Sequence, residues 1–326
     1  MPETWCNEPQ ILDSLLAAVP EILADQKSTG QFGDEPWICR DQHRMFALAA
    51  VWQLPGNRYY HDPVVLESIV RSGDALIDDQ DEQGMWTFRK KDHSTWGQIY
   101  MPWTYSRWIR TYRIIRGHVD ELTQNRWDTA LTLGFEGIAG HELGRIHNIP
   151  AHHAMALYCA GEVLERPEWQ EQANDFLSKV IAEQSPHGWW TEHVGPVVAY
   201  NYVYVDALGV YYSLSGDDSV LEALERAARF HANYTYPDGS MVETVDERNP
   251  YHPGIHLGNP GFSYTAAGRG YLAQQHSLHI SSGGTFDEDY AANMILSAGE
   301  GLIEETAGLR ERHHFRMDDD ALIVRH

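Results

Sequence analysis

The sequence predicts an all-α protein built as an (α/α) toroid of helix hairpins. A helix-hairpin unit recurs about every fifty residues, and each unit closes on a glycine followed by a bulky side chain. The steps from Gly30 to Gly84, Gly188 and Gly239 are 54, 104 and 51 residues, so one degenerate unit falls within residues 127–140. Helices that are apolar on most sides alternate with amphipathic ones, which is typical of an open solenoid, an incomplete ring or a closed ring of hairpins.

The first predicted helix precedes Gly30 and carries one apolar stripe of helical period, with Pro20 as the position of a kink. The stripe consists of Ile11, Leu12, Leu15, Leu16, Val19, Ile22 and Leu23. Three later windows each contain an amphipathic helix and end at glycine and a large side chain; they cover residues 61–86, 166–190 and 216–241. First-turn prolines and capping-box spacing mark their helix starts, at Asp62-Pro63, Arg166-Pro167 and Ser219 with Glu222.

Between these windows the sequence predicts an inner layer of helices that the amphipathic helices cover. These inner helices are rich in small and aromatic residues and are apolar over more of their circumference, in residues 44–54, 101–116, 152–164 and 199–214. The Trp and Tyr residues at the hairpin ends favour the closed ring, in which the ends of the inner helices converge on one cleft.

The carboxyl-terminal part departs from the repeat. Residues 251–285 are rich in Gly, Pro, Asn and Ser, which predicts long loops with one short helix at 265–275, and a helix over 287–305 closes the domain. Residues 321–324 read as a lone strand, and a lone strand needs a partner. We therefore expect a toroid domain over residues 1–312 and a terminal strand, or the start of a β-rich domain, over 313–326.

Composition excludes several classes of protein. The chain has 326 residues, 43% of them hydrophobic, which is normal for a packed core. It contains no apolar run long enough to span a bilayer, and its net charge of −23 argues against binding to nucleic acid or anionic membranes. The three cysteines suggest neither a disulfide framework nor a zinc site. A reducing, cytoplasmic location fits the sequence as written, and a periplasmic or secreted one fits if a signal peptide was removed.

Candidate chemical groups cluster in two segments. The first is Gly188-Trp189-Trp190-Thr191-Glu192-His193, which is followed on the next inner helix by Tyr200, Tyr202 and Tyr204. The second runs from Arg145 through His147, Asn148, His152 and His153 at the start of the preceding inner helix. An amide, an arginine and several imidazoles thus gather near phenols at the expected cleft.

The order and spacing of Asn148, His193 and Tyr202 resemble those in the polysaccharide lyases with an (α/α) toroid, which include the chondroitin and hyaluronate, heparinase II/III and alginate lyase types. The resemblance covers residues 30–271, and Tyr200 competes with Tyr202 for the tyrosine position. It implies β-elimination next to a uronic acid in an acidic polysaccharide or oligosaccharide, without a cofactor. The family's arginine after the tyrosine has no clear match here, and Arg248 is the nearest residue.

The chemistry explains these residue types independently. A proton α to a carboxylate becomes acidic only when hydrogen bonds or cations neutralise the carboxylate, which Asn148 is expected to do. A tyrosine then abstracts the proton and protonates the leaving oxygen, with His193 as its charged neighbour or as the base itself. The residues expected to bind substrate are Trp189, Trp190, Arg145, His147, Glu192, Arg107 and Arg248.

Each of these residues also has a purely structural interpretation. The tyrosines are equally typical of a packed core, Asn148 of a helix cap, and the tryptophans of plugs at the hairpin ends. His147, His152 and His153 lack the i, i+4 spacing and acidic third ligand of a zinc motif, so no metal site is predicted. The arginines spaced by three residues form either a solvated helix face or a local basic patch; they are Arg107, Arg110, Arg113 and Arg116.

Two other functions remain open from the sequence. Glu192 and Glu243 occupy equivalent places after their glycines, which suits a toroidal glycoside hydrolase that uses paired carboxylates, or Glu192 with Asp206. A non-enzymatic module that binds glycans or proteins through its aromatic rim is the third hypothesis. The sequence sets no oligomeric state.

Overall fold

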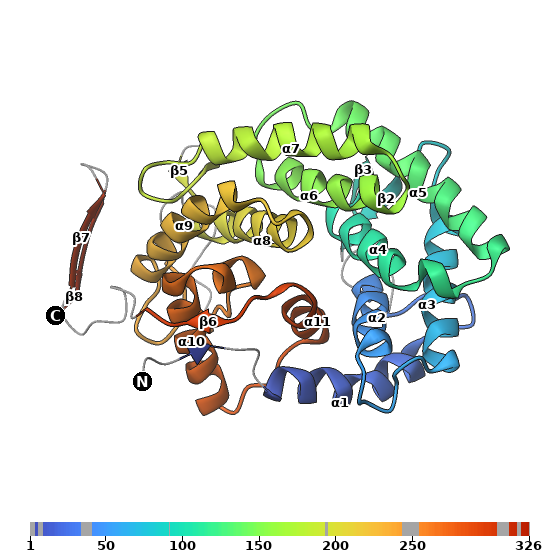
Figure 1. Ribbon diagram of the computed structural model, residues 1–326, viewed down its shortest axis with the longest axis horizontal. Helices are drawn as coiled ribbons and strands as arrows, with labels where there is room; N and C mark the ends of the chain where they lie inside the picture. Colours follow the sequence, from blue (N-terminus) through green and yellow to red (C-terminus); the bar gives the residue numbers. More distant parts are fainter. Residues whose placement is uncertain are drawn as a thin grey trace.

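The computed structural model describes residues 4–5, 9–33, 41–90, 92–192, 195–242, 254–304, 313–317 and 321–325. Within these ranges eleven α-helices form a ring in two layers (Figure 1). The inner layer consists of α2 (Arg44–Gln53), α4 (Pro102–Ile115), α6 (Asn148–Val163), α8 (Val198–Ser215), the 3₁₀ helix η4 (Pro260–Tyr264) and α11 (Glu288–Ser297). The outer layer consists of α1 (Pro9–Asp25), α3 (Pro63–Asp79), α5 (Glu121–His141), α7 (Pro167–Ala182), α9 (Leu221–Asn233) and α10 (Ala266–Ser281).

The ring is closed. Each inner helix packs against the next from α2 to α8, η4 packs between α8 and α10, and α11 packs against both α1 and α2 (Figure 1). The predicted toroid of helix hairpins is therefore confirmed, and its degenerate unit is the hairpin of α4 and α5. In the described part of the chain, no helix combines the length and the apolar character needed to cross a bilayer.

The glycines that end the repeated hairpins share one backbone conformation. Gly30, Gly84, Gly188 and Gly239 have φ values of +92°, +84°, +93° and +86°, in the region that side chains disfavour. A Cβ at Gly188 would also lie 2.1 Å from a backbone oxygen of α9. Both constraints explain why glycine recurs at this place.

A glutamine belongs to the same repeated turn, and the sequence interpretation missed it. The side chains of Gln26, Gln80 and Gln184, each four residues before the glycine, donate to that glycine's carbonyl at 3.0, 3.4 and 3.2 Å. The side chain two residues after the glycine then points into the core, where Trp86 and Trp190 donate their indole N–H to backbone carbonyls of the preceding helix. The glycine and the bulky side chain therefore fix the end of each hairpin against the preceding helix.

Some element boundaries differ from the predictions. Ser219 does not cap α9; Asp217 instead accepts the Ser219 backbone N–H at 3.0 Å in a short 3₁₀ turn. Helix α10 extends to Ser281, well beyond the short helix expected there. The closing helix ends at Ser297, because the chain then becomes extended and strand β6 (Gly301–Leu302) pairs with β1 (Thr4–Trp5).

Three further two-stranded sheets occur in the described ranges, and only one of their strands was expected. They are β2 (Trp86–Arg89) with β3 (Thr95–Ile99), β4 (Thr191–Glu192) with β5 (Gly195–Pro196), and β7 (His313–Met317) with β8 (Ala321–Arg325). Strand β8 matches the predicted terminal strand. The expectation that it stands alone is wrong, since β7 immediately before it supplies the partner (Figure 1).

Candidate functional site

A cavity of about 540 Å³ opens at the amino-terminal ends of the inner helices. Residues from the amino-terminal parts of α4, α8 and α11 line it, and the first turn of a helix carries partial positive charge that favours anionic groups. The lining consists of His43, Met101, Trp103, Arg107, Ala199, Tyr202, Val203, Asp206, His256, Leu257, Gly258, Asn259, Asp287, Asp289, Tyr290 and Asn293.

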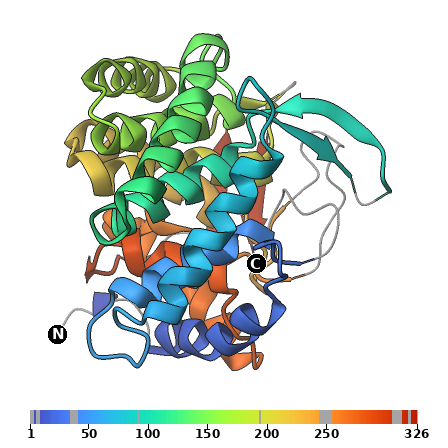
Figure 2. The same ribbon diagram turned by 90° about the vertical axis from the view of Figure 1, so that its right-hand side faces the viewer.

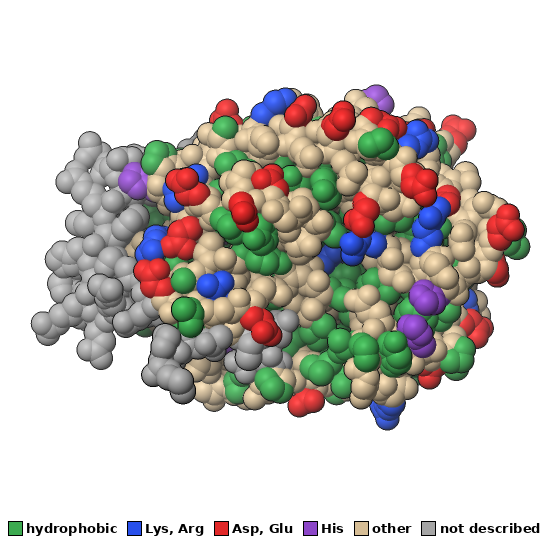
Figure 3. Space-filling view, in the orientation of Figure 1, with side chains coloured by type: hydrophobic (Ala, Val, Ile, Leu, Met, Phe, Trp, Pro, Cys, Tyr) green, Lys and Arg blue, Asp and Glu red, His purple; other side chains and the backbone are tan. Residues whose placement is uncertain are grey.

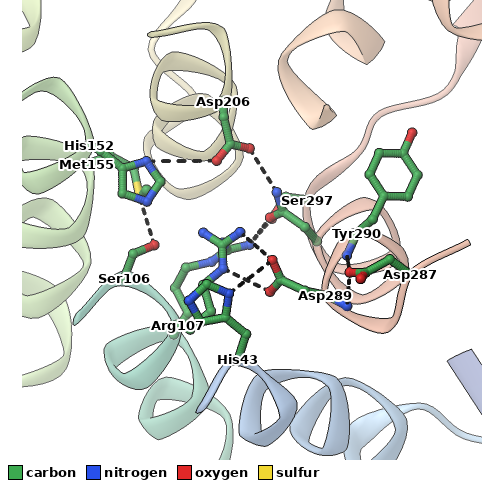
Figure 4. A network of polar contacts seen from close by, with 12 residues as sticks. His43, Ser106, Arg107, His152, Met155, Asp206, Asp287, Asp289, Tyr290 and Ser297 are labelled. Atoms are coloured by element: carbon green, nitrogen blue, oxygen red, sulfur yellow. Dashed lines mark hydrogen bonds and ion pairs between the residues drawn. The ribbon is translucent and has the colours of Figure 1, made fainter. Parts of the chain in front are cut away.

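A buried ion pair crosses the ring at this cavity (Figure 4). Arg107 of α4 donates to Asp289 of α11 through Nε and Nη2, both at 3.0 Å, and His43 Nδ1 lies 3.4 Å from the same carboxylate. Burial acts to raise the pKa of Asp289, but the Arg107 charge and His43 together hold it well below its usual value. The pair therefore carries charge yet contributes little net charge to the cavity.

A second polar chain joins α4, α11 and α8. Arg110 Nη2 donates to Asn293 Oδ1 at 2.8 Å and to Ser297 at 2.7 Å, and Asn293 Nδ2 donates to Asp206 Oδ1 at 2.8 Å. His152 Nδ1 lies 3.9 Å from Asp206 Oδ2, and burial together with the arginines lowers the pKa of His152 well below its usual value. His152 is therefore neutral, and the Asn293 amide and the His152 ring, which contact the two Asp206 oxygens, are both uncharged.

The arginine run of α4 is not one solvated face. Arg107 and Arg110 are buried because α2, α6 and α11 surround this part of the inner helix. Arg113 and Arg116 do face outward, where they pair at 3.0 Å with Glu162 and Asp128. The four guanidinium groups therefore form neither one solvated face nor one basic patch, since two are buried in the ring and two pair with carboxylates at its outside.

Tyr202 forms part of the cavity wall and is 5% exposed. Its ring packs on those of His256 and His231, with centroids 3.7 and 4.0 Å away, and its hydroxyl hydrogen-bonds to the Tyr271 hydroxyl. Burial lowers the pKa of His256 to about 4, so this neighbour is neutral. Tyr200 is half-buried and is absent from the described lining of the cavity, which favours Tyr202.

The carboxylate of Glu192 organises the start of α6. Glu192 has no exposed surface, and its Oε1 accepts the backbone N–H of Asn148 at 2.8 Å and the Tyr204 hydroxyl at 2.6 Å. His147 Nε2 lies 2.7 Å from Glu192 Oε2, and His147 Nδ1 lies 3.1 Å from Asn148 Nδ2. Because an amide nitrogen donates, His147 Nδ1 accepts and its Nε2 carries the proton.

The structure therefore connects Asn148, His147 and Glu192 in one chain of contacts. Asn148 begins α6 but its side chain does not cap the helix; Glu192, from the segment that follows α7, does so at the positive end of the helix dipole. Arg145 is exposed. It lies near this cluster, because its charge acts to lower the pKa of Tyr204, although burial has the larger effect and raises that pKa. None of these residues lines the cavity as far as the described residues define it.

The two tryptophans differ in position. Trp190 is buried and stacks on Tyr204 with ring centroids 4.8 Å apart, so its side chain fills the end of the hairpin. Trp189 is half-buried against the core. The other sequence candidates, His193, Glu243 and Arg248, lie outside the described residues, and their roles stay predictions.

Comparison with known proteins identifies the fold. No protein-family model matches the sequence, and no curated protein matches it. Among solved structures, the chain is similar to the chondroitin AC lyase of Streptomyces coelicolor A3, with a TM-score of 0.56 and 15% identity over 94% of this chain and 48% of that one. It is also similar to heparinase III, with a TM-score of 0.50 and 15% identity over 90% and 48% of the two chains. The chain thus spans about half the length of each lyase and has their helical toroid fold.

Proposed function

We propose that this chain is the helical domain of a lyase that cleaves a polysaccharide or oligosaccharide next to a uronic acid by β-elimination. Two observations support the proposal: an amide is held at the start of one inner helix, and a tyrosine lies in the cavity wall on the next inner helix. Asn148 is fixed by Glu192 and His147, and Tyr202 faces the cavity. The toroid fold shared with two polysaccharide lyases supports the same reading.

Helical spacing supports the inference that Asn148 and Tyr202 lie at the same height along their two neighbouring helices. His152 follows Asn148 by four residues on α6, and Asp206 follows Tyr202 by four residues on α8, so each pair shares a helix face. His152 and Asp206 lie 3.9 Å apart across the packed helices. We infer that Asn148 and Tyr202 lie one helical turn nearer the amino-terminal ends of α6 and α8 than His152 and Asp206, and that the two side chains flank one substrate position.

The proposed reaction breaks a C–H bond and a C–O bond, and it forms a carbon–carbon double bond and the O–H bond of the leaving group. An N–H of Asn148 hydrogen-bonds the uronate carboxylate, which stabilises the negative charge that develops when the α-proton leaves. The Tyr202 oxygen takes that proton and returns it to the glycosidic oxygen as the C–O bond breaks and a carbon–carbon double bond forms. His193 stays the predicted cationic neighbour or alternative base for this step.

An ultraviolet assay tests the proposal directly. Incubation with alginate, hyaluronan, chondroitin, heparin-type and ulvan-type polysaccharides is expected to produce absorbance from the unsaturated uronate product for at least one substrate. The net charge of −23 favours a substrate with carboxylates alone over a heavily sulfated one. No gain in absorbance across the panel would contradict the lyase proposal.

A glycoside hydrolase is the second candidate, because Asp206 and Asp287 line the cavity. New reducing ends without the unsaturated chromophore would select it. Glu192 suits this mechanism poorly, since it is enclosed and already accepts two hydrogen bonds. Binding of glycans without turnover would instead indicate the non-enzymatic module.

We also propose that residues 313–326 belong to a β-rich unit distinct from the toroid of residues 1–312. The supporting observation is that β7 and β8 pair with each other, and in the described ranges neither pairs with a strand of the ring.

Glu192→Gln is expected to lower kcat for elimination by about tenfold or more and to change KM less. The glutamine amide would place a donor against the Nε2–H of His147, so His147 would lose the tautomer that holds the Asn148 amide. Steady-state kinetics across pH 6–9 checks this, and loss of the charged contacts is expected to cost about 1.5–3 kcal/mol of stability.

The matched control for this variant is Glu142→Gln, which changes the carboxylate 3.7 Å from the buried His153 instead. It is expected to alter stability and leave kcat near the wild-type value. A Glu192→Gln protein with lowered melting temperature but unchanged kcat would show that Glu192 has only a structural role.

A further inference from the structure

A β-hairpin extends from the ring beyond the helices (Figure 2). We call residues 86–99, which include β2 and β3, the arm. Trp86 anchors its base in the core, whereas the outer part of the arm is exposed and Trp96 is 68% exposed. A large aromatic side chain with this exposure is unusual in a protein whose other tryptophans in the described ranges are buried or half-buried.

The backbone of the arm directs Trp96 outward. Phe88 pairs with Gly97 and Arg89 pairs with Thr95, so Trp96 is the extra residue of a β-bulge. Bulges turn a side chain away from the regular alternation of the strand, and Gly97 supplies the positive φ of +100° next to it. The Trp96 ring lies 5.1 Å from the Phe88 ring, and Lys90 Nζ lies 5.4 Å from the Trp96 centroid.

The arm is also basic in an acidic protein. Arg89, Lys90 and Lys91 are consecutive, although the whole chain has 24 Lys and Arg against 47 Asp and Glu. Figure 3 shows acidic side chains spread over one face of the molecule, with Lys and Arg in small groups. Arg89 and Lys90 are exposed, and no carboxylate of the described chain forms an ion pair with either. Asp92 lies nearby, but its carboxylate is bonded to Ser94.

The arm is continuous with the cavity. Strand β3 leads through Tyr100 into Met101 and Trp103, and both of these line the cavity. The five residue steps from Trp96 to Met101 span at most about 17 Å of extended chain. The arm is therefore within reach of sugars that adjoin a sugar bound in the cavity.

We propose that the arm binds a carboxylate-bearing stretch of the polysaccharide at a distance from the bond that is cleaved. Trp96 and Phe88 stack on a sugar face, and Arg89 and Lys90 pair with carboxylates. The identity of the polymer rests on the function proposed for the cavity, but binding to the arm requires no chemistry. A glycan is favoured over nucleic acid because the net charge of −23 repels a densely charged polyanion over the rest of the surface.

Affinity electrophoresis at low salt tests the arm. The protein is expected to be retarded in gels that contain alginate or hyaluronan and to run freely in gels that contain dextran. Trp96→Ala and Lys90→Gln are each expected to weaken the interaction about five- to tenfold, and Trp96→Phe is expected to restore most of the loss. Leu122→Ala removes an 80% exposed apolar side chain from α5 and serves as the control with unchanged retardation.

Equal retardation of Trp96→Ala and wild type, or retardation of wild type by dextran, would overturn the proposal. Tighter binding of the wild-type protein to oligothymidylate than to either glycan, lost in Trp96→Ala, would also overturn it. Elimination is measured separately: Trp96→Ala is expected to raise KM for the polymer about fivefold or more and to raise KM for a tetrasaccharide less, because a shorter substrate contacts less of the arm. Retardation that depends on Trp96, without absorbance from an unsaturated product, supports binding by the arm and contradicts the lyase proposal. Absorbance from an unsaturated product, with the same KM for the polymer in Trp96→Ala and wild type, supports the lyase proposal and contradicts binding by the arm.

Discussion

Tyr202→Phe is expected to lower kcat for elimination by about 10²- to 10⁴-fold, the usual contribution of a group that transfers a proton in the transition state. The hydroxyl is the only group that the change removes, and the ring keeps its packing on His256 and His231. Because Tyr271 retains a second hydroxyl contact, to Thr235 at 3.3 Å, the loss of stability is expected to be about 1 kcal/mol. Initial rates from product absorbance at saturating substrate provide the measurement.

The matched control is Tyr271→Phe, which removes the same hydrogen bond from its other side. Tyr271 is fully buried and lies outside the described lining of the cavity, so this variant is expected to keep kcat within a few fold of wild type. Equal losses of kcat in the two variants would show that the hydrogen bond has a structural role, and Tyr200 would again be a candidate for the catalytic tyrosine.

Acidification from pH 7.5 to 5.5 is expected to destabilise the protein strongly. Burial lowers the pKa of His153, His256 and His276 to about 4, while an unfolded histidine titrates near 6.5. In the window from about 6.5 to 4 the unfolded chain binds protons that the folded chain does not, so stability falls as pH falls and is constant above that window. Each histidine contributes about 1.4 kcal/mol per pH unit, and these three together about 4 kcal/mol.

Asp289 acts in a lower window. Its pKa in the folded protein is depressed, so the stability it confers is present above the unfolded value near 4 and is lost only as pH falls further. The loss between pH 6.5 and 5 therefore belongs to the histidines.

Urea unfolding at pH 7.5, 6.5 and 5.5 provides the measurement for this prediction. His153→Gln tests the cause, since a glutamine amide replaces the ring N–H that donates to the Tyr100 carbonyl at 2.8 Å but does not titrate. Its slope of stability against pH is expected to be smaller than that of wild type by about one proton. A wild-type stability that stays constant down to pH 5.5 would contradict the assignment.

The fold was largely predictable because its signals are local. The hairpin-end glycines adopt a positive φ that few other residues tolerate, and inner helices such as α2 and α6 are apolar on every side because neighbours surround them. The arm was missed because β2 and β3 are short and are stabilised mainly by each other. The overlong closing helix was an error of the same kind, since its end depends on pairing between β6 and the distant β1.

The site was less predictable because its contacts are long-range. Arg107 has the spacing of a solvated helix face, and its half-buried partner Asp289 lies 182 residues away. Glu192 was expected to contact substrate, but the carboxylate is directed inward onto the start of α6, which lies 44 residues earlier in the chain. Periodicity reports which face of a helix is buried, and it contains no information on which distant side chain meets that face.

The closure of the ring by α11 has a consequence for folding. The last inner helix packs on α1 and α2, so the seam joins segments from opposite ends of the toroid and closes the longest loop of the ring. Contacts of such sequence separation have a high loop-closure entropy and form late in folding. During synthesis, the hairpins can assemble one after another while Arg107 still lacks its counter-ion, and the cavity gains its final charge balance only when α11 docks.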